Sequence, residues 1–380
     1  MDGPLKNLLV IDLTRVLVGP YCTMILSDLG ARVIKVEAPE IGDDSRNFGP
    51  FIKDYSAYFM SLNRGKESIA LNLKNSEDKK IFDKILSKAD ILVENFKPGT
   101  LEKWGYGWKN INKKNPKLIY ASASGFGQTG PLRELPAYDM VVQGMGGLMS
   151  VTGQPNSDPT RVGTSIGDIT AGLFTTIGIN AALYERQKTG KGMYIDVSML
   201  DCQIAILENA IARYLSKNEI PKPMGSRHPS IAPFEAFKTK DSYIIIAAGN
   251  DKLFAELCSA LNRNDLITNK KFISNENRCQ NMSELKNIFE LILKLKNTNE
   301  WIKEFTPRKI PCGPINNIKE AVESDQIKAR NMIVSAYHKK IGDFKLAGNP
   351  IKMSAYDDKN KRDDIPDLDE HREKILKEFT

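Results

Sequence analysis

Residues 8–37 read LLVIDLTRVLVGPYCTMILSDLGARVIKVE, and this stretch decides the class of fold. Its two ends, residues 8–13 and 33–37, are short apolar runs of the length of a strand. Between them, a glycine-proline loop leads into a helical stretch that stops at Gly30. A strand, a helix and a second strand in this order predict a βαβ unit, and therefore a parallel sheet.

The same alternation of strand and helix continues to about residue 125. Further strands are predicted at residues 69–73, 91–93 and 118–121. Ligands of parallel sheets bind at the carboxyl ends of the strands. The binding edge is therefore expected at the loops of residues 14–20, 94–99 and 122–130.

Beyond this region, the pattern predicts a helix from Ile169, a strand at 193–197 and a long amphipathic helix at 200–215. A joint rich in proline and glycine, residues 220–233, then marks a domain boundary. After it we predict a small α+β domain, with strands at 234–238 and 243–247 and helices near 251–262, 283–296 and 317–329. The mixed-charge tail from Asp357 is expected to lie on the solvated surface.

Composition excludes several classes of partner. The chain has 380 residues, with 54 basic and 47 acidic side chains and a net charge of +7. The basic residues are spread along the chain without a nucleic-acid motif, so we expect no nucleic-acid partner. The five cysteines are scattered, which favours free thiols in a reducing compartment.

No membrane partner is predicted either. The first residues lack the basic start and apolar run of a signal peptide. The longest charge-free apolar stretch, residues 169–184, is shorter than the roughly 20 residues of a membrane span, and we expect it to be a buried helix. These patterns favour a soluble, cytoplasmic protein.

Several familiar chemistries lack their sequence patterns. The loop after the first strand contains one glycine and no G-x-G-x-x-G, which argues against a nicotinamide enzyme. There is no G-x-x-x-x-G-K-[ST] and no G-x-S-x-G turn, and the chain has only three histidines. The spacing of histidine and cysteine predicts no metal site.

Asp168 is the carboxylate that draws attention. It follows the glycine-rich and serine-rich residues 161–167 and directly precedes the apolar helix. Spacing alone makes it a helix N-cap. A carboxylate in that position is kept ionised by the helix dipole, and neighbouring glycines allow a substrate to come close. Because a carboxylate nucleophile needs both properties, the structural role and a catalytic role are compatible.

Eight segments in register carry a resemblance to a known family. They are VIDLTRVLVGPYCTMILSDLGARVIKVEAP (10–39), NRGKESIALNLK (63–74), ILVENFKPGTLEKWGYG (91–107), ASASGFGQTGP (121–131), AYDMVVQGMGGLMSVTG (137–153), RVGTSIGDITAGL (161–173), KTGKGMYIDVSMLD (188–201) and IPCGPINNIKEAVESDQIKARNM (310–332). Over nearly the whole chain, the sequence resembles the class III coenzyme A transferases, the formyl-CoA transferase and CaiB–BaiF family.

The resemblance implies a reaction. Asp168 matches the family's catalytic aspartate, which attacks a donor thioester to give a mixed anhydride and then an aspartyl-CoA thioester. Coenzyme A (CoA) and its esters are then substrates, carboxylic acids are the acceptors, and no cofactor is bound permanently.

The resemblance also implies the residues that hold CoA. The loop along the thioester matches Val16, Leu17 and Val18, and the strand ends for adenine and pantetheine match Leu71, Asn72, Leu73, Lys74, Asn95 and Phe96. The thioester site matches Ala137, Tyr138, Asp139 and Met199. Lys97 and Lys103 match basic contacts to the phosphates, although both are equally well explained as solvated surface charges.

The family fold is an interlocked homodimer in which the large domain combines both ends of the chain. We therefore expect an α/β fold with a Rossmann-like parallel sheet formed by residues 1–219 and 330–380. Residues 220–329 are expected to form the smaller α+β domain with its linkers.

Three departures from the family pattern bear on the substrate. Ala38 and Pro136 stand where some members carry basic residues, so the phosphate contacts must pass to other residues, such as Arg64, Lys66 or Arg133. Residues 224–230 replace the mobile polyglycine loop of formyl-CoA transferases, which argues against oxalate and formyl-CoA.

The replacing segment contains Gly225, Arg227 and His228. The guanidinium of Arg227 could pair with the second carboxylate of a dicarboxylic acid, which suggests succinyl-CoA as the donor. A surface arginine in a hinge explains Arg227 equally well, and His228 is better explained as a structural residue of that hinge.

Two alternative functions stay open. An α-methylacyl-CoA racemase on the same scaffold needs a second base, but its histidine would stand at Tyr138, and a phenol with a pKa near 10 is a poor base. A non-catalytic CoA-binding protein would keep its activity when Asp168 is replaced.

Overall fold

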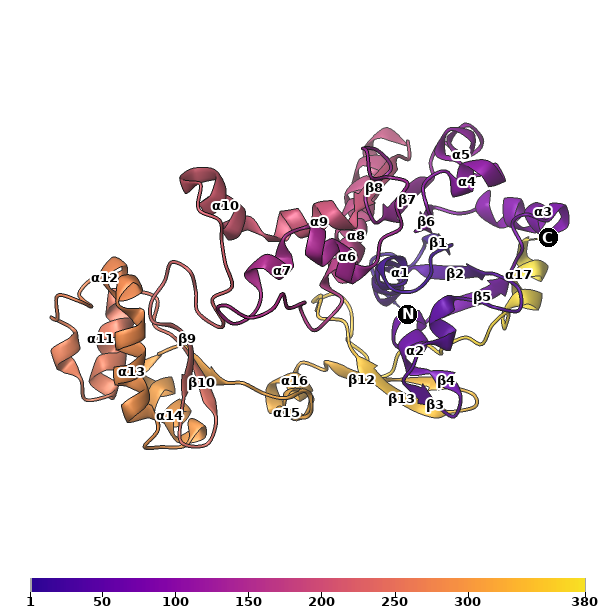
Figure 1. Ribbon diagram of the computed structural model, residues 1–380. Helices are drawn as coiled ribbons and strands as arrows, with labels where there is room; N and C mark the ends of the chain where they lie inside the picture. Colours follow the sequence, from indigo (N-terminus) through magenta and orange to yellow (C-terminus); the bar gives the residue numbers. More distant parts are fainter. Residues whose placement is uncertain (1, 380) are drawn as a thin grey trace. The chain divides into compact units, whose positions relative to one another are not determined.

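The computed structural model describes residues 2–379. The chain divides into two compact units (Figure 1). Unit 1 contains Met1–Met149, Arg161–Ile220 and Asp325–Thr380, and unit 2 contains Ser150–Thr160 and Pro221–Ser324. These bounds differ from the predicted ones, because residues 150–160 group with unit 2, while residue 220 and residues 325–329 group with unit 1.

Unit 1 is built on a six-stranded sheet in which every neighbouring pair is parallel. The order is β5 (Lys66–Ala70), β2 (Arg32–Glu37), β1 (Leu9–Asp12), β6 (Ile91–Glu94), β7 (Ile119–Ser124) and β8 (Tyr194–Ser198). The chain starts at β1, proceeds outward to β5, and then returns to the other side of β1. This reversal of strand order creates a crevice at the carboxyl ends of β1 and β6, where such sheets bind ligands.

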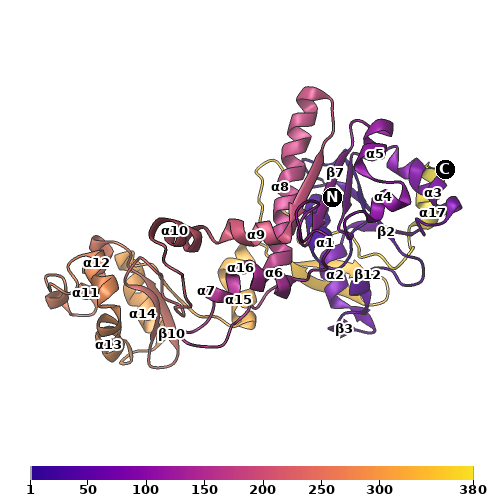
Figure 2. The ribbon, with the colours of Figure 1, turned by 45° about the horizontal axis from the view of Figure 1, so that its top comes forward.

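Helices cover both faces of the sheet, because successive strand residues point to opposite sides. Val10 packs against α1 (Val18–Asp28) and α8 (Ile166–Thr189) on one face. Ile11 packs on the other face against α3 (Ser76–Leu86), α5 (Trp108–Lys114) and α17 (Arg372–Phe379). Figure 2 shows α8 as a long helix beside α1 and β7.

The helix α8 is packed closely against α1 and is partly buried. A Cβ atom at Gly172 would lie 2.7 Å from the carbonyl oxygen of Val18, so only glycine allows α8 to approach α1 so closely. By length and composition, α8 passes the test for a membrane span, but half of its most apolar stretch is buried inside the structure, as in a core helix.

The remaining elements of unit 1 are short. They are β3 (Phe51–Ile52), β4 (Tyr55–Ser56), α2 (Ala57–Asn63), α4 (Thr100–Trp104), α6 (Asp139–Met145), α9 (Met199–Ile206), α10 (Glu208–Lys217), α16 (Asp325–Ala329), β12 (Ile333–His338) and β13 (Gly342–Ala347). One more helix, α7 (Leu148–Val151), spans the sequence boundary between the units.

Unit 2 contains a three-stranded antiparallel sheet in the order β11 (Cys312–Pro314), β10 (Tyr243–Ala247) and β9 (Phe234–Lys238). Its helices are α11 (Asp251–Ala260), α12 (Asn275–Gln280), α13 (Met282–Leu293), α14 (Thr298–Phe305) and α15 (Ile318–Glu323). Phe237, Phe254 and Phe289 lie at the centre of its core.

Four local predictions were wrong. The apolar helix begins at Ile166 with Ser165 as its N-cap, so Asp168 is the third helical residue and not the cap. The predicted helix at 200–215 is interrupted at Leu207, and the one at 317–329 is interrupted at Ser324. The strand predicted at 69–73 begins at Lys66. Because Lys66 is charged although it is buried, a search for apolar runs does not include it in the strand.

The C-terminal tail was also wrongly placed on the solvated surface. Arg362, Ile365 and Ile375 are buried, and α17 contacts both α3 and β5. The tail is charged, but its few apolar residues find partners more than 250 residues earlier in the chain, such as Phe82. A local composition pattern does not contain such contacts.

Candidate active site

Two adjoining cavities lie at the carboxyl ends of the strands of unit 1. The Asp168 cavity has a volume of about 230 Å³ and is lined by Arg15–Val18, Asp44, Asn95–Pro98, Ala123–Gly125, Arg133, Leu135–Tyr138, Asp168 and Met199. The Ala38 cavity, of about 410 Å³, is lined by Leu13–Arg15, Val36–Pro39, Ile41–Asp44, Leu71–Lys74, Phe96 and Trp104. Because both cavities are lined by Arg15, Asp44 and Phe96, they form one elongated groove.

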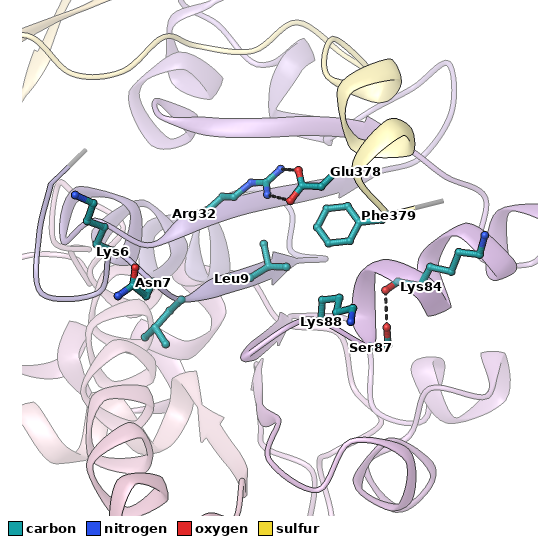
Figure 3. Close-up of a pocket in the computed structure, with 10 residues that line it drawn as sticks. Lys6, Asn7, Leu9, Arg32, Lys84, Ser87, Lys88, Glu378 and Phe379 are labelled. Atoms are coloured by element: carbon teal, nitrogen blue, oxygen red, sulfur yellow. Dashed lines mark hydrogen bonds and ion pairs between the residues drawn. The ribbon is translucent and has the colours of Figure 1, made fainter.

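A larger cavity of about 710 Å³ lies beside the amino ends of β1 and β2 (Figure 3). It contains none of the predicted site residues. Its guanidinium, Arg32, already pairs with Glu378 at 2.5 Å and with Glu67 at 2.9 Å. The groove at the opposite edge is therefore the better candidate for the active site.

The loop after β1 forms one wall of the groove and is held by buried charges. Val16 has a positive φ of 67°, which is a strained conformation for a β-branched residue. Its N–H donates to Asp43 Oδ1 at 3.0 Å. Lys35 Nζ lies 2.8 Å from Asp43 Oδ2 and donates to the carbonyl of Thr14 at 2.7 Å, and both ionic side chains are buried. Together, these contacts fix the conformation of the loop and keep Val16 at its strained φ angle.

The end of β6 forms the facing wall. Asn95 clamps the neighbouring loop, since its Oδ1 accepts from the Arg15 N–H at 2.9 Å and its Nδ2 donates to the Arg15 carbonyl at 2.8 Å. Behind it, the buried Glu94 accepts from the Phe96 N–H at 2.8 Å. Burial raises the pKa of Glu94 to about 7.

Asp168 lies in the first turn of α8, and Asp139 positions that turn. Asp139 Oδ1 accepts from the Gly167 N–H at 2.8 Å, while its Oδ2 accepts from Gln143 at 2.7 Å. A Cβ atom at residue 167 would lie 2.7 Å from Val142 and 3.0 Å from Asp139 Oδ1, so a glycine is needed for this close approach.

The electrostatics of Asp168 differ from the expectation of a carboxylate kept ionised by the helix dipole. Burial and, secondly, the negative charge of Asp139 raise the pKa of Asp168 to about 7. The two effects outweigh the favourable helix position. Asp168 is thus a poorly solvated carboxylate that is ionised only from about neutral pH upward.

Sequence reasoning missed Tyr58 of α2. Burial and then the charge of Asp168 raise the pKa of Tyr58 to about 12, which places the phenol within electrostatic reach of the carboxylate. No motif singled out this tyrosine, because it lies 110 residues before Asp168 and only the fold brings the two groups together.

The structure brings most predicted site residues into the groove. The Asp168 cavity collects Val16, Leu17, Val18, Asn95, Phe96, Lys97, Ala137, Tyr138, Asp168 and Met199, and the Ala38 cavity collects Leu71, Asn72, Leu73 and Lys74. Asp139 stands behind the first turn of α8. Lys103 is exposed on α4 and lines neither cavity.

Three predicted substrate residues lie in unit 2, where local contacts hold them. Gly225 has a φ of 65° and its N–H donates to the Gly153 carbonyl at 2.9 Å. The guanidinium of Arg227 donates to the carbonyl of Cys279. His228 packs against Phe234, with ring centroids 5.3 Å apart.

The proposed phosphate contacts Arg64 and Lys66 were wrong. Arg64 is buried and pairs with Asp28 at 2.6 Å. Lys66 is buried against Asp12 at 3.0 Å, and burial lowers the pKa of its ammonium to about 8. Arg133, in contrast, is exposed and lines the Asp168 cavity.

Within residues 2–379, no group of three or more histidine, cysteine, aspartate and glutamate side chains could hold a metal ion. The charged groups that line the groove are cations and four carboxylates, of which Asp44 and Asp168 line the Asp168 cavity and Glu37 and Asp43 are held in buried ion pairs with Arg46 and Lys35. The arrangement suits an elongated anionic ligand whose reactive end reaches Asp168.

The fold and the site together define an α/β enzyme that binds its ligand at the carboxyl edge of a parallel sheet and offers it a carboxylate. The sequence model described as "CoA-transferase family III" matches residues 5–372. The chain belongs to this family, and it is a CoA-transferase.

Relatives with known names agree with this assignment. The chain is 46% identical to an acetyl-CoA:oxalate CoA-transferase of Acetobacter aceti, over 99% of this chain and 96% of the relative. It is 40% identical to the human succinyl-CoA:glutarate CoA-transferase, over 99% of this chain and 86% of the relative. A CAIB/BAIF family protein from Brucella suis has the same fold, with a TM-score of 0.88, 37% identity and full coverage of both chains. The predicted family and the α/β fold with a large parallel sheet are confirmed.

Proposed function

We propose that the enzyme transfers CoA from a donor such as succinyl-CoA to a dicarboxylic acid, with Asp168 as the nucleophile. The observation that carries this proposal is the place of Asp168 in the groove. Its carboxylate lines the same cavity as the loop of Val16–Val18 and as Asn95 and Phe96, the segments that the family resemblance assigns to CoA.

The reaction needs no redox partner and no net proton transfer. An oxygen of Asp168 attacks the donor carbonyl, the carbon–sulfur bond breaks, and a mixed anhydride and CoA thiolate form. The thiolate attacks the aspartyl carbonyl and releases the donor acid, which leaves an aspartyl-CoA thioester. The acceptor carboxylate then displaces the thiolate, and the thiolate finally attacks the acceptor's carbonyl and frees Asp168. Covalent intermediates divide one difficult exchange into easier steps.

The surroundings of Asp168 support this role. A carboxylate that is partly shielded from water is a stronger nucleophile once it is ionised, and the pKa of about 7 leaves much of it ionised at neutral pH. The cations Lys97 and Arg133 line the same cavity and can offset the negative charge of the thiolate and of both acids.

The proposal of dicarboxylic acids rests on the relatives. Those described above are named for oxalate and glutarate as acceptors and for acetyl-CoA and succinyl-CoA as donors. The argument against oxalate from the missing polyglycine loop loses its support, because the relative named for oxalate is 46% identical to this chain. Oxalate therefore returns to the list of acceptors to be tested.

We also propose the family's interlocked homodimer and its two-domain arrangement for this chain. Leu173, Phe174 and Ile177 on α8 are large apolar side chains that a single chain leaves exposed. A second copy that covers them would remove this apolar surface from water.

A panel of donors and acceptors, combined with trapping at Asp168, tests the proposal. The protein is incubated with succinyl-CoA or acetyl-CoA and then with hydroxylamine or borohydride, and the modified peptide is identified by mass spectrometry. We expect the modification at Asp168, and a loss of roughly 10³-fold or more in transfer rate for Asp168→Ala.

The matched control is Asp343→Ala, which removes an exposed carboxylate from β13. It is expected to keep the wild-type rate. Full transferase activity in Asp168→Ala, without an adduct at this residue in the wild type, would contradict the proposal. Exchange of the α-proton of a branched acyl-CoA, without transfer, would favour the racemase.

A further inference from the structure

The groove has lost the basic residues that the resemblance leads one to expect around the CoA phosphates. The two residues at these positions are uncharged: Ala38 lines the Ala38 cavity and Pro136 lines the Asp168 cavity. Arg64 and Lys66 are buried in ion pairs with Asp28 and Asp12 and cannot replace them. Lys97 and Arg133 line only the Asp168 cavity and Lys74 lines only the Ala38 cavity, so none of them stands where the two cavities meet.

We propose that Arg15 binds the diphosphate of CoA and leaves its ion pair with Asp44 when CoA enters. This inference rests on the proposed function, because it takes CoA as the ligand of the groove. The sequence placed Arg15 in a loop of the expected binding edge without assigning it a contact, and the structure shows that its side chain lines both cavities.

Arg15 lies where the diphosphate of a bound CoA is expected. CoA is a linear molecule in which the diphosphate separates the nucleoside from the pantetheine arm and its thiol. When the thioester lies at Asp168, the nucleoside reaches the Ala38 cavity beside residues 71–74, and the diphosphate lies where the cavities meet. The residues that line both cavities are Arg15, Asp44 and Phe96, and of these three only Arg15 is a cation.

The backbone of Arg15 is fixed, whereas its guanidinium is exposed. Asn95 fixes its backbone by two hydrogen bonds, at 2.9 and 2.8 Å, so the root of the side chain has a defined place beside the groove. The guanidinium end is free to turn, since 57% of the side chain is exposed. A fixed root and an exposed head suit a side chain that changes partners.

In the absence of CoA, Arg15 has only a weak partner, Asp44. Arg15 Nη1 lies 2.9 Å from Asp44 Oδ2, but the two side chains are 57% and 42% exposed, and ion pairs that water reaches in this way are screened. A diphosphate carries more charge than one carboxylate and offers oxygens to both arms of the guanidinium, so it is the stronger partner. Asp44 repels the incoming phosphates, and its pair with Arg15 is the contact that CoA replaces.

The test measures dissociation constants of the full-length Arg15→Gln variant for three ligands by titration calorimetry or by competition. For CoA and for dephospho-CoA, which keeps the diphosphate, we expect the dissociation constant to rise roughly 10- to 100-fold. For pantetheine, which has no phosphate, we expect no change. Asp44→Asn, which removes the competing charge, is expected to bind CoA more tightly than the wild type.

The control is Arg263→Gln, since Arg263 forms a comparable exposed pair with Asp265 at 2.7 Å in unit 2. An unchanged affinity of Arg15→Gln for CoA would overturn the inference, while transfer by the wild type would leave the proposed function intact. A loss of affinity for pantetheine as well would show a merely structural role. A defect that disappears with dephospho-CoA would assign Arg15 to the 3′-phosphate instead. Failure of the wild type to bind CoA would contradict the proposed function itself.

Discussion

At the scale of single residues, Asp168 has a function that conflicts with stability. The side chain is shielded from water and stands near the negative charge of Asp139, and both effects raise the pKa of Asp168 from 3.8 to about 7. An unfolded chain would ionise the same carboxyl near 3.8. Ionised Asp168 therefore lowers the free energy of unfolding, although the reaction needs this residue as an ionised nucleophile.

Asp168→Asn is expected to stabilise the protein at pH 8 and to have little effect at pH 4. Above about pH 7 the carboxylate is ionised in both states, so the folded state carries the full penalty of the raised pKa. As the pH falls from 7 toward 4, the folded state takes up a proton first and the penalty disappears. The gain in the free energy of unfolding at pH 8 should be on the order of a few kcal/mol.

Urea denaturation of both proteins at the two pH values measures this difference. The exposed control Asp343→Asn should show no such dependence on pH. Equal stabilisation by Asp168→Asn at pH 4 and pH 8 would mean that the asparagine improves packing and that the charge carries no penalty.

At the scale of elements, the loop after β1 depends on strands that lie beside it. Lys35 in β2 and Asp43 form a buried ion pair, and this pair holds both the Thr14 carbonyl and the Val16 N–H. A second buried pair, Lys66 and Asp12, lies at the end of β1 itself. The two pairs set the course of the chain where it forms the wall of the groove.

Asp43→Ala is expected to lower the free energy of unfolding by about 3–5 kcal/mol, because it leaves the Lys35 ammonium buried without its partner. It should also raise the KM for the CoA ester, since Val16 loses the acceptor of its N–H. Chemical denaturation and steady-state kinetics measure the two effects.

Two further variants make this prediction sharp. Asp44→Ala removes the neighbouring, exposed carboxylate and should change the free energy of unfolding by less than about 1 kcal/mol. Adding Lys35→Met to Asp43→Ala should recover much of the lost stability, because the double variant buries no unpaired charge. Wild-type stability of Asp43→Ala alone would rule out this role for the ion pair.

At the scale of the whole molecule, the apolar face of α8 points to a partner chain. Ile177 is 61% exposed, and Leu173 and Phe174 on the same helix are also exposed. Soluble monomers rarely leave such side chains together on one helix, because each loses contact with other apolar atoms and remains in water.

We expect the protein in solution to have twice the mass of one 42.5 kDa chain. Ile177→Glu should weaken this dimer, since it places a charge on the apolar face, whereas Lys109→Glu on the exposed surface of α5 should not. Size-exclusion chromatography with light scattering measures both. A monomeric wild type at micromolar concentration would contradict the prediction.

Much of the fold could be predicted because its signals are local. The strands β1 and β6 lie where short apolar runs predict them, since the central strands of a buried parallel sheet need apolar residues on both faces. The boundary of β5 could not be predicted, because Lys66 pairs with Val33 of β2 and its charge is buried against Asp12, 54 residues earlier, and neither contact is local in sequence.

The same division holds for the site. The sequence by itself determined the parallel sheet, its binding edge and the family motifs that carry Asp168, because periodicity and motif spacing are properties of neighbouring residues. Only the tertiary structure decided which charges face the ligand, since burial depends on distant parts of the chain. In the folded chain, Arg64 and Lys66 are buried in ion pairs, whereas Arg15 lines the groove. Asp139 lies close enough to Asp168 to raise its pKa.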